Sequence, residues 1–139
     1  SIAIHEGITA IAPFAFAGCE SLEEIIVDED NQYFKSIDGN LYTKDGKTLM
    51  RYAIGKKDSN FTIQDSVTTI GALAFEACNN LTSVVIPKGV TTIGQLAFSE
   101  CNSLTDLYYM GSEEEWAKIT TYDNSFKPEG VEIHFNYAP

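Results

Sequence analysis

The sequence is poor in the side chains that nucleophilic and metal-dependent enzymes use. It has two histidines and three cysteines in 139 residues, and they do not form the closely spaced pairs of a zinc site. Basic residues are also few: 9 Lys and Arg against 20 Asp and Glu give a net charge of −11, which argues against binding to nucleic acid or to an anionic membrane surface. No apolar run approaches the roughly 18 residues of a membrane-spanning helix, so we expect no membrane insertion.

What the sequence does contain is internal repetition. The stretch SVTTIGALAFEACNNLTSVVIPKG (66–89) returns 23 residues later as GVTTIGQLAFSECNSLTDLYYMGS (89–112), and a further copy, GITAIAPFAFAGCESLEEIIVDED, occupies residues 7–30. Repeats of about 20–29 residues with one short strand each predict a solenoid, in which stacked coils contact only their neighbours.

Each repeat contains a triplet of β-branched or aromatic residues that predicts a short strand. The triplets lie at residues 2–4, 25–27, 61–63, 84–86 and 107–109, at successive offsets of 23, 36, 23 and 23. Stacked about 4.8 Å apart, they would form one parallel sheet. A second block, such as VTTIGALAF (67–75), predicts an extended piece and then about one helical turn at its Ala-Phe step, where Phe75 and its equivalent Phe98 would fill the interior. We therefore expect an α/β solenoid of about five coils.

The offset of 36 is one repeat plus a 13-residue insertion, which falls between residues 31 and 60. Asp38-Gly39 and Asp45-Gly46 each lie beside alternating apolar residues, which is a strong signal for a β-hairpin. The pattern predicts strands at about 34–37, 40–43 and 48–53. We expect this unit to replace the helical side of one coil and to bulge from the stack.

The C-terminal part, about 110–139, departs from the repeat and predicts a cap over the last coil, which solenoids require. Ser112 and Glu115 have the spacing of a helix capping box, and residues 131–135 (VEIHF) predict a final edge strand. Residue 1 falls inside a repeat, and no comparable cap precedes Ile2. We expect residues 1–139 to form one solenoid domain that is a fragment of a longer protein.

Three segments together resemble the BspA-type leucine-rich repeat family. They are AFEACNNLTSVVIPKGVTTIG (74–94), the hairpin unit FKSIDGNLYTKDGKTLMRYAIGKK (34–57), in which Ala53 replaces the usual Pro, and the closing unit YYMGSEEEWAKI (108–119). The resemblance implies a leucine-rich-repeat-like, right-handed stack. It also implies export to the surface of host-associated bacteria and a role in adhesion or in binding host matrix proteins. It supplies no catalytic motif.

The cysteines favour a structural role. Cys19, Cys78 and Cys101 share one repeat position, three residues before a leucine, which predicts a buried ladder of thiols. Gly55 stands at this position in the inserted coil, so Cys19 and Cys78 would lie about 10 Å apart, too far for a disulfide. Adjacent coils would leave the Cβ atoms of Cys78 and Cys101 slightly too far apart.

No other group of residues predicts a catalytic or metal site. His5 and His134 fall at opposite ends of the solenoid, where we expect both to be surface residues beside strands. The acidic run at residues 28–31 lacks the Gly and the distal Glu of an EF-hand loop and predicts a solvated turn. We therefore expect no catalytic residues, no metal and no cofactor.

The outer face of the strand sheet is the candidate binding surface. Period-two alternation points Leu81, Val84 and Ile86 inward and stacks the intervening residues in outward rows. These rows are Ala3, Ile26, Thr62, Val85 and Tyr108; Ser1, Glu24, Asn60, Ser83 and Asp106; and His5, Asp28, Gln64, Pro87 and Met110. The alternative is that the apolar members are only good strand formers on a solvated face. The hairpin aromatics (Tyr33, Phe34, Tyr42 and Tyr52) are a second possible surface, although core packing fits them better.

The candidate site is therefore an apolar ridge with polar neighbours, and we expect a monomeric, extracellular or cell-surface module that binds a host protein. Its candidate residues are Ile26, Thr62, Val85, Tyr108, Glu24, Ser83, Asp106 and Met110. Two alternatives stay open: a structural spacer that holds another domain, and a carbohydrate-binding module, which would need two or three exposed, coplanar aromatic rings.

Overall fold

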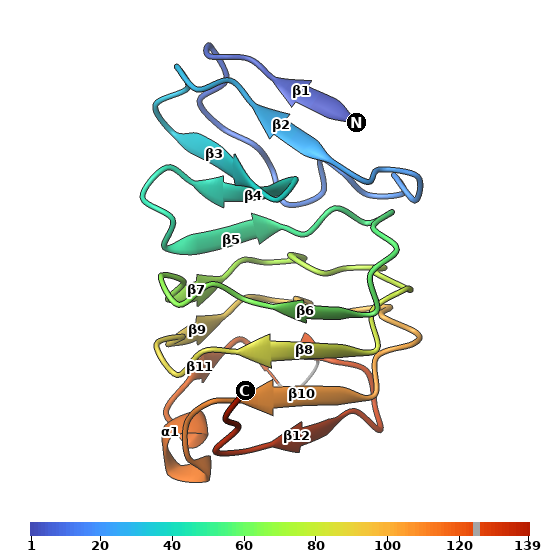
Figure 1. The fold of residues 1–139 in the computed structure, drawn as a ribbon, viewed down its shortest axis with the longest axis vertical. Helices are drawn as coiled ribbons and strands as arrows, with labels where there is room; N and C mark the ends of the chain where they lie inside the picture. Colours follow the sequence, from blue (N-terminus) through green and yellow to red (C-terminus); the bar gives the residue numbers. More distant parts are fainter. Residues whose placement is uncertain (124–125) are drawn as a thin grey trace.

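The chain winds into a β-solenoid of about six turns with parallel sheets and almost no helix (Figure 1). The computed structural model describes residues 1–123 and 126–139, so positions 124 and 125 of the expected cap lie outside the described residues. The solenoid type is as predicted from the repeats, but the α/β class is wrong. The sole helix among the described residues, α1 (Glu113–Ala117), lies near the C-terminal end.

Two parallel sheets form the outer face, where one was expected. β1 (Ile2–Ile4) pairs only with β2 (Ile25–Val27). A four-stranded sheet follows in the order β12-β10-β8-β6, formed by Asn60–Thr62 (β6), Ser83–Ile86 (β8), Asp106–Tyr109 (β10) and Glu132–His134 (β12). The strand predicted at residues 131–135 is confirmed as the edge strand β12.

The opposite side carries a six-stranded sheet in the order β11-β9-β7-β5-β4-β3. The short parallel strands β7 (Thr69–Ile70), β9 (Thr92–Ile93) and β11 (Thr120–Thr121) come from successive coils. The predicted hairpin unit provides the other three: β3 (Phe34–Ile37), β4 (Asn40–Thr43) and β5 (Thr48–Arg51). Asp38 and Gly39 both have positive φ, 51° and 78°, as a two-residue hairpin turn requires.

The hairpin unit does not bulge from the stack, because β5 pairs in parallel with β7 and continues the sheet (Figure 1). On its other side the N–H of Ile25 donates to the carbonyl of Gly39, at 2.8 Å, and the N–H of Val27 donates to Ser36 Oγ. The hairpin thus lies between β2 and the later coils, which explains why the outer face is divided in two.

The Ala-Phe step is a series of tight turns and not the expected helical turn. Leu73 and Ala77 both have φ of 60°, in the left-handed region. This backbone directs the N–H groups of Leu73, Phe75 and Ala77 along the solenoid axis, where they donate to carbonyls of the next coil at 2.7–3.0 Å. A helix would use the same N–H groups within one coil, so stacking and helix formation exclude each other here.

The core is a column of side chains that repeats from coil to coil. Phe75 and Phe98 are fully buried, with ring centroids 4.7 Å apart and planes 6° apart. Tyr52, from the end of the hairpin unit, extends this stack at 5.5 Å from Phe75. A second, smaller core lies under β1 and β2 around Ile25 and Leu41. The expected interior position of the two phenylalanines is confirmed.

Arg51 is a buried cation, 3% exposed, that the sequence analysis missed. Its guanidinium donates to the carbonyls of Leu73 and Glu76 and lies 3.7 Å from the Glu76 carboxylate. One coil further on, the carbonyl equivalent to that of Glu76 belongs to Ser99 and accepts the backbone N–H of Ala77. Arg51 therefore replaces a backbone donor that the hairpin unit cannot provide. Burial lowers the pKa of the Arg51 guanidinium.

The cysteine ladder is confirmed in its central part. Cys78 and Cys101 are buried and free, and burial raises the pKa of the Cys101 thiol to about 12. Cys19, in the first coil, is also free but only half-buried. Gly55 packs against the backbone of Ser21, where a Cβ atom would come within 2.7 Å, so this position has no room for a side chain.

The capping box is confirmed at the start of α1. The N–H of Glu115 donates to Ser112 Oγ, and the N–H of Ser112 donates to the Glu115 carboxylate, both at 3.1 Å. These two bonds satisfy amide groups that a helix end leaves free. Trp116, on this helix, packs edge-on against the buried Tyr109.

We expect Phe75→Ala and Phe98→Ala each to lower the free energy of unfolding by about 3–5 kcal/mol, because each substitution leaves a cavity in the column. Phe14→Ala is the control, since Phe14 is 69% exposed; it should change stability by less than about 0.5 kcal/mol. Urea unfolding measures all three. A loss below about 1 kcal/mol for Phe75→Ala would contradict the proposed packing.

We expect Arg51→Met to lower the free energy of unfolding by at least about 2 kcal/mol, because the Glu76 carbonyl loses its guanidinium donor and the Leu73 carbonyl keeps only the N–H of Glu76. Lys57→Met is the matched control, since Lys57 is 81% exposed and pairs with Glu23 only at the surface. If the two variants unfolded at the same urea concentration, Arg51 would not have the role assigned to it.

Candidate functional site

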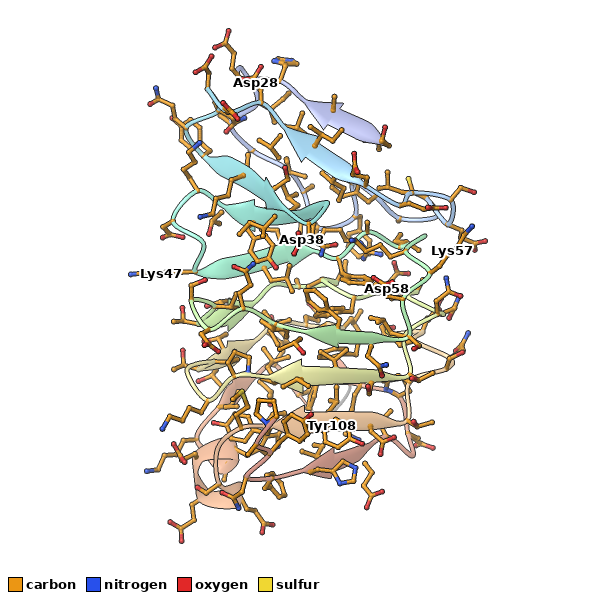
Figure 2. The ribbon with its side chains drawn as sticks, in the orientation of Figure 1. Asp28, Asp38, Lys47, Lys57, Asp58 and Tyr108 are labelled. Carbon is orange, nitrogen blue, oxygen red and sulfur yellow. The ribbon has the colours of Figure 1, made fainter. Side chains whose placement is uncertain are left out.

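The outer face of the four-stranded sheet presents the predicted apolar row. Thr62, Val85, Tyr108 and His134 are successive Cα partners across β6, β8, β10 and β12. Thr62 is exposed and the other three are partly exposed. The inward direction predicted for Leu81, Val84 and Ile86 is confirmed, because all three are buried. Figure 2 shows Tyr108 over this sheet.

A polar row runs beside the apolar one. Asn60, Ser83, Asp106 and Glu132 are its Cα partners across the same strands. The Ser83 hydroxyl donates to Asn60 Oδ1, and the Thr105 hydroxyl donates to Asp106 Oδ2 at 2.7 Å. The four-stranded sheet therefore carries an apolar ridge next to a polar and acidic one, as the alternation predicted.

Ile26 and Glu24 do not belong to this face, because the rows are not continuous along the whole solenoid. Ile26 lies on β2, in the separate two-stranded sheet, and is 44% exposed; Glu24 precedes that strand. The expected five-member rows are wrong at this point. In the third row only Pro87 is buried; Met110 is partly exposed beside Lys88, and His5, Asp28 and Gln64 are exposed or partly exposed.

An aromatic group that the sequence analysis missed lies at the β12 end of the face. The rings of Tyr108 and His134 stack with centroids 4.7 Å apart and planes 17° apart, and the ring of Tyr137 lies 4.9 Å from Tyr108. The N–H of Tyr137 donates to the carbonyl of Tyr109 at 3.0 Å and holds the C-terminal segment against β10. The residues after 119 do not follow the 23-residue repeat, so the sequence offered no register to place them.

His134 is not merely a surface residue beside a strand. It lies within β12, and its Nε2 is 2.8 Å from Asp106 Oδ1. Hydrogen bonds from His134 and Thr105 hold the pKa of the Asp106 carboxyl below its usual value. His5 is exposed next to β1 at the opposite end of the solenoid, as expected.

The other candidate groups are mostly structural. Phe34, Tyr42 and Tyr52 are buried, which confirms core packing for the hairpin aromatics, and Tyr33 alone of the four is exposed. The three acidic residues of the run 28–31 are exposed, as predicted for a solvated turn, and the Asp28 carboxylate accepts the N–H of Asp30.

Asn31, at the end of that run, is fully buried, and its side chain makes four hydrogen bonds. Its amide donates to the carbonyls of His5 and Ile8, and its oxygen accepts the N–H groups of Tyr33 and Phe34. It therefore joins the first two coils to the hairpin unit. The expectation of a wholly solvated turn is wrong at this residue.

A cavity of about 110 Å³ lies between the first coil and the hairpin unit. Its walls include Phe16, Leu41 and Met50, and the neighbouring Arg51 guanidinium already binds backbone carbonyls. It thus lacks the combination of free polar groups that a ligand site uses. No helix in the described part of the chain is long and apolar enough to cross a bilayer.

The sequence matches the family model described as BspA type Leucine rich repeat region in six copies, over residues 1–44 and 52–127. Residues 45–51, which form the second hairpin turn and β5, and residues 128–139, which include β12, lie outside the match. No curated protein matches the sequence.

Three crystal structures have a similar fold. A leucine-rich repeat protein from Eubacterium ventriosum is 26% identical with a TM-score of 0.80, covering 96% of this chain and 35% of that one. The pneumococcal vaccine antigen PcpA is 17% identical with a TM-score of 0.70, covering 97% of this chain and 44% of that one. A leucine-rich repeat protein from Bacteroides capillosus is 25% identical with a TM-score of 0.55, covering 74% and 98%.

This chain thus spans less than half the length of the first two proteins. The family match, in contrast, covers most of the chain and includes repeats on both sides of the hairpin turn. The chain belongs to the BspA-type leucine-rich repeat family.

Proposed function

We propose that this chain is a non-catalytic interaction module that binds another protein through the outer face of the sheet β12-β10-β8-β6. The observation that carries the proposal is the partly exposed ridge of Val85, Tyr108 and His134 beside the polar row that ends in Asp106 and Glu132. Protein interfaces combine such an apolar and aromatic centre with a polar border, and tyrosine is enriched in them.

The charge of the face supports a partner with a basic surface. Asp106 and Glu132 lie on the face itself, and the whole chain carries a net charge of −11. Complementary charge accelerates encounter and suppresses wrong partners, so a basic patch on the partner would fit.

We further propose that the module belongs to an exported bacterial cell-surface protein and that its partner is a host extracellular or surface protein. The likeness of fold to a pneumococcal vaccine antigen supports this assignment. In this proposal residues 1–139 act as one monomeric domain of a longer protein.

A carbohydrate-binding role is a second candidate, because Tyr108, His134 and Tyr137 lie together. Sugars stack on free ring faces. Here Tyr108 and His134 cover one face of each other at 4.7 Å, and the ring of Tyr137 is tilted by 46° to that of Tyr108. The group is therefore better suited to contact a protein than to form a flat sugar platform.

A pure spacer role would leave this face without a ligand.

Binding to an array of purified host matrix proteins and glycans tests the proposal. We expect the protein to bind at least one matrix protein and the double variant Val85→Glu/Tyr108→Glu to lose at least about tenfold in affinity, since it places charge in the centre of the ridge. Ile26→Glu is the matched control, because Ile26 is an exposed outward residue on the separate sheet.

Each result decides between the candidates, provided that thermal unfolding shows both variants to be folded. Equal loss in Ile26→Glu would place the site elsewhere. Binding to glycans alone would favour the carbohydrate reading. Absence of binding to any array member would favour the spacer.

A further inference from the structure

Three potential metal ligands converge on the outer face where β10 meets β12. Asp106, Glu132 and His134 each offer a ligand atom, and these atoms lie within 4.8 Å of one another. Asp106 and Glu132 are Cα partners across the two strands, and His134 is two residues beyond Glu132, so all three side chains leave the sheet on the same side. Within the described part of the chain, this is the one such group of three.

Two of the three side chains are already held in position. The Asp106 carboxylate accepts the Thr105 hydroxyl on Oδ2, at 2.7 Å, which leaves Oδ1 directed at His134 Nε2. The His134 ring is fixed by its stack on Tyr108. Contacts that orient a ligand in this way strengthen metal binding.

The distances between the ligand atoms suit a metal ion that forms short bonds to its ligands. His134 Nε2 lies 2.8 Å from Asp106 Oδ1 and 4.0 Å from Glu132 Oε2. Two ligand atoms that each lie about 2.0–2.1 Å from a tetrahedral ion are about 3.3 Å from each other. This separation falls between the two distances measured from His134 Nε2. Glu132 is 73% exposed and can rotate inward, while Asp106 and His134 are 29% and 36% exposed, so solvent and ions reach them.

The donor set selects the class of ion. Mg²⁺ and Ca²⁺ favour oxygen ligands alone, whereas an imidazole nitrogen with two carboxylates suits zinc and related transition metals. We propose that Asp106, Glu132 and His134 form a surface site for a divalent transition-metal ion such as Zn²⁺. Three protein ligands leave a fourth position open to water or to a donor from a bound molecule.

Isothermal titration with Zn²⁺ alone, in a buffer that does not chelate it, tests this inference. We expect one saturable site in the unaltered protein and a loss of at least about tenfold in affinity for His134→Ala and for Asp106→Asn. His5→Ala is the matched control and should bind as the unaltered protein does, since His5 is the other histidine of the chain and lies at the far end.

Thermal unfolding with and without Zn²⁺ gives a second readout. Zn²⁺ should raise the midpoint of the unaltered protein and of His5→Ala by more than that of the other two variants, because the intact folded site binds the ion more tightly than the altered sites do. Absence of saturable binding, or binding that survives both His134→Ala and Asp106→Asn, would overturn the inference. No partner is present in either assay, so the result is independent of the proposed interaction role.

Discussion

The structure depends on one constraint: the backbone polar groups of each coil must be satisfied by the coils on either side. In the central coils this is done by direct pairing, as where the N–H of Phe75 donates to the carbonyl of Ala97 at 2.7 Å. Repeats of constant length make such pairing possible, because equivalent residues come into register after 23 residues. Where the repeat is interrupted, buried side chains supply the missing partners, as Arg51 and Asn31 do.

The same constraint determines where a binding face can exist. The hairpin unit enters the stack between β2 and the later coils and ends the continuity of the outer sheet (Figure 1). The unbroken outer face therefore lies in the half of the structure that follows the hairpin unit, on β6, β8, β10 and β12. The edge strand β12 gives this half its distinctive chemistry, because it brings His134 next to Tyr108 and Asp106.

Much of the fold could be predicted from the sequence because repetition and turn chemistry are local. The strand triplets, the Asp38-Gly39 hairpin and the Ser112 capping box lie within a residue or two of their predicted positions. The turn at Leu73 could not be predicted, because its residues suit a helical turn as well and only stacking excludes one. The candidate site was half predicted: Val85 and Tyr108 follow from alternation, but His134 comes from a segment without the repeat.

Native-state hydrogen exchange tests most directly the claim that coil-to-coil hydrogen bonds integrate the hairpin unit into the stack. The amides of Tyr52 and Gly71 join the hairpin to the following coil, and that of Phe75 joins two regular coils. The account predicts that all three exchange with similar protection, because they open in one cooperative event. Exchange of Tyr52 and Gly71 more than about 100-fold faster than Phe75 would show that the hairpin opens separately, which contradicts the account.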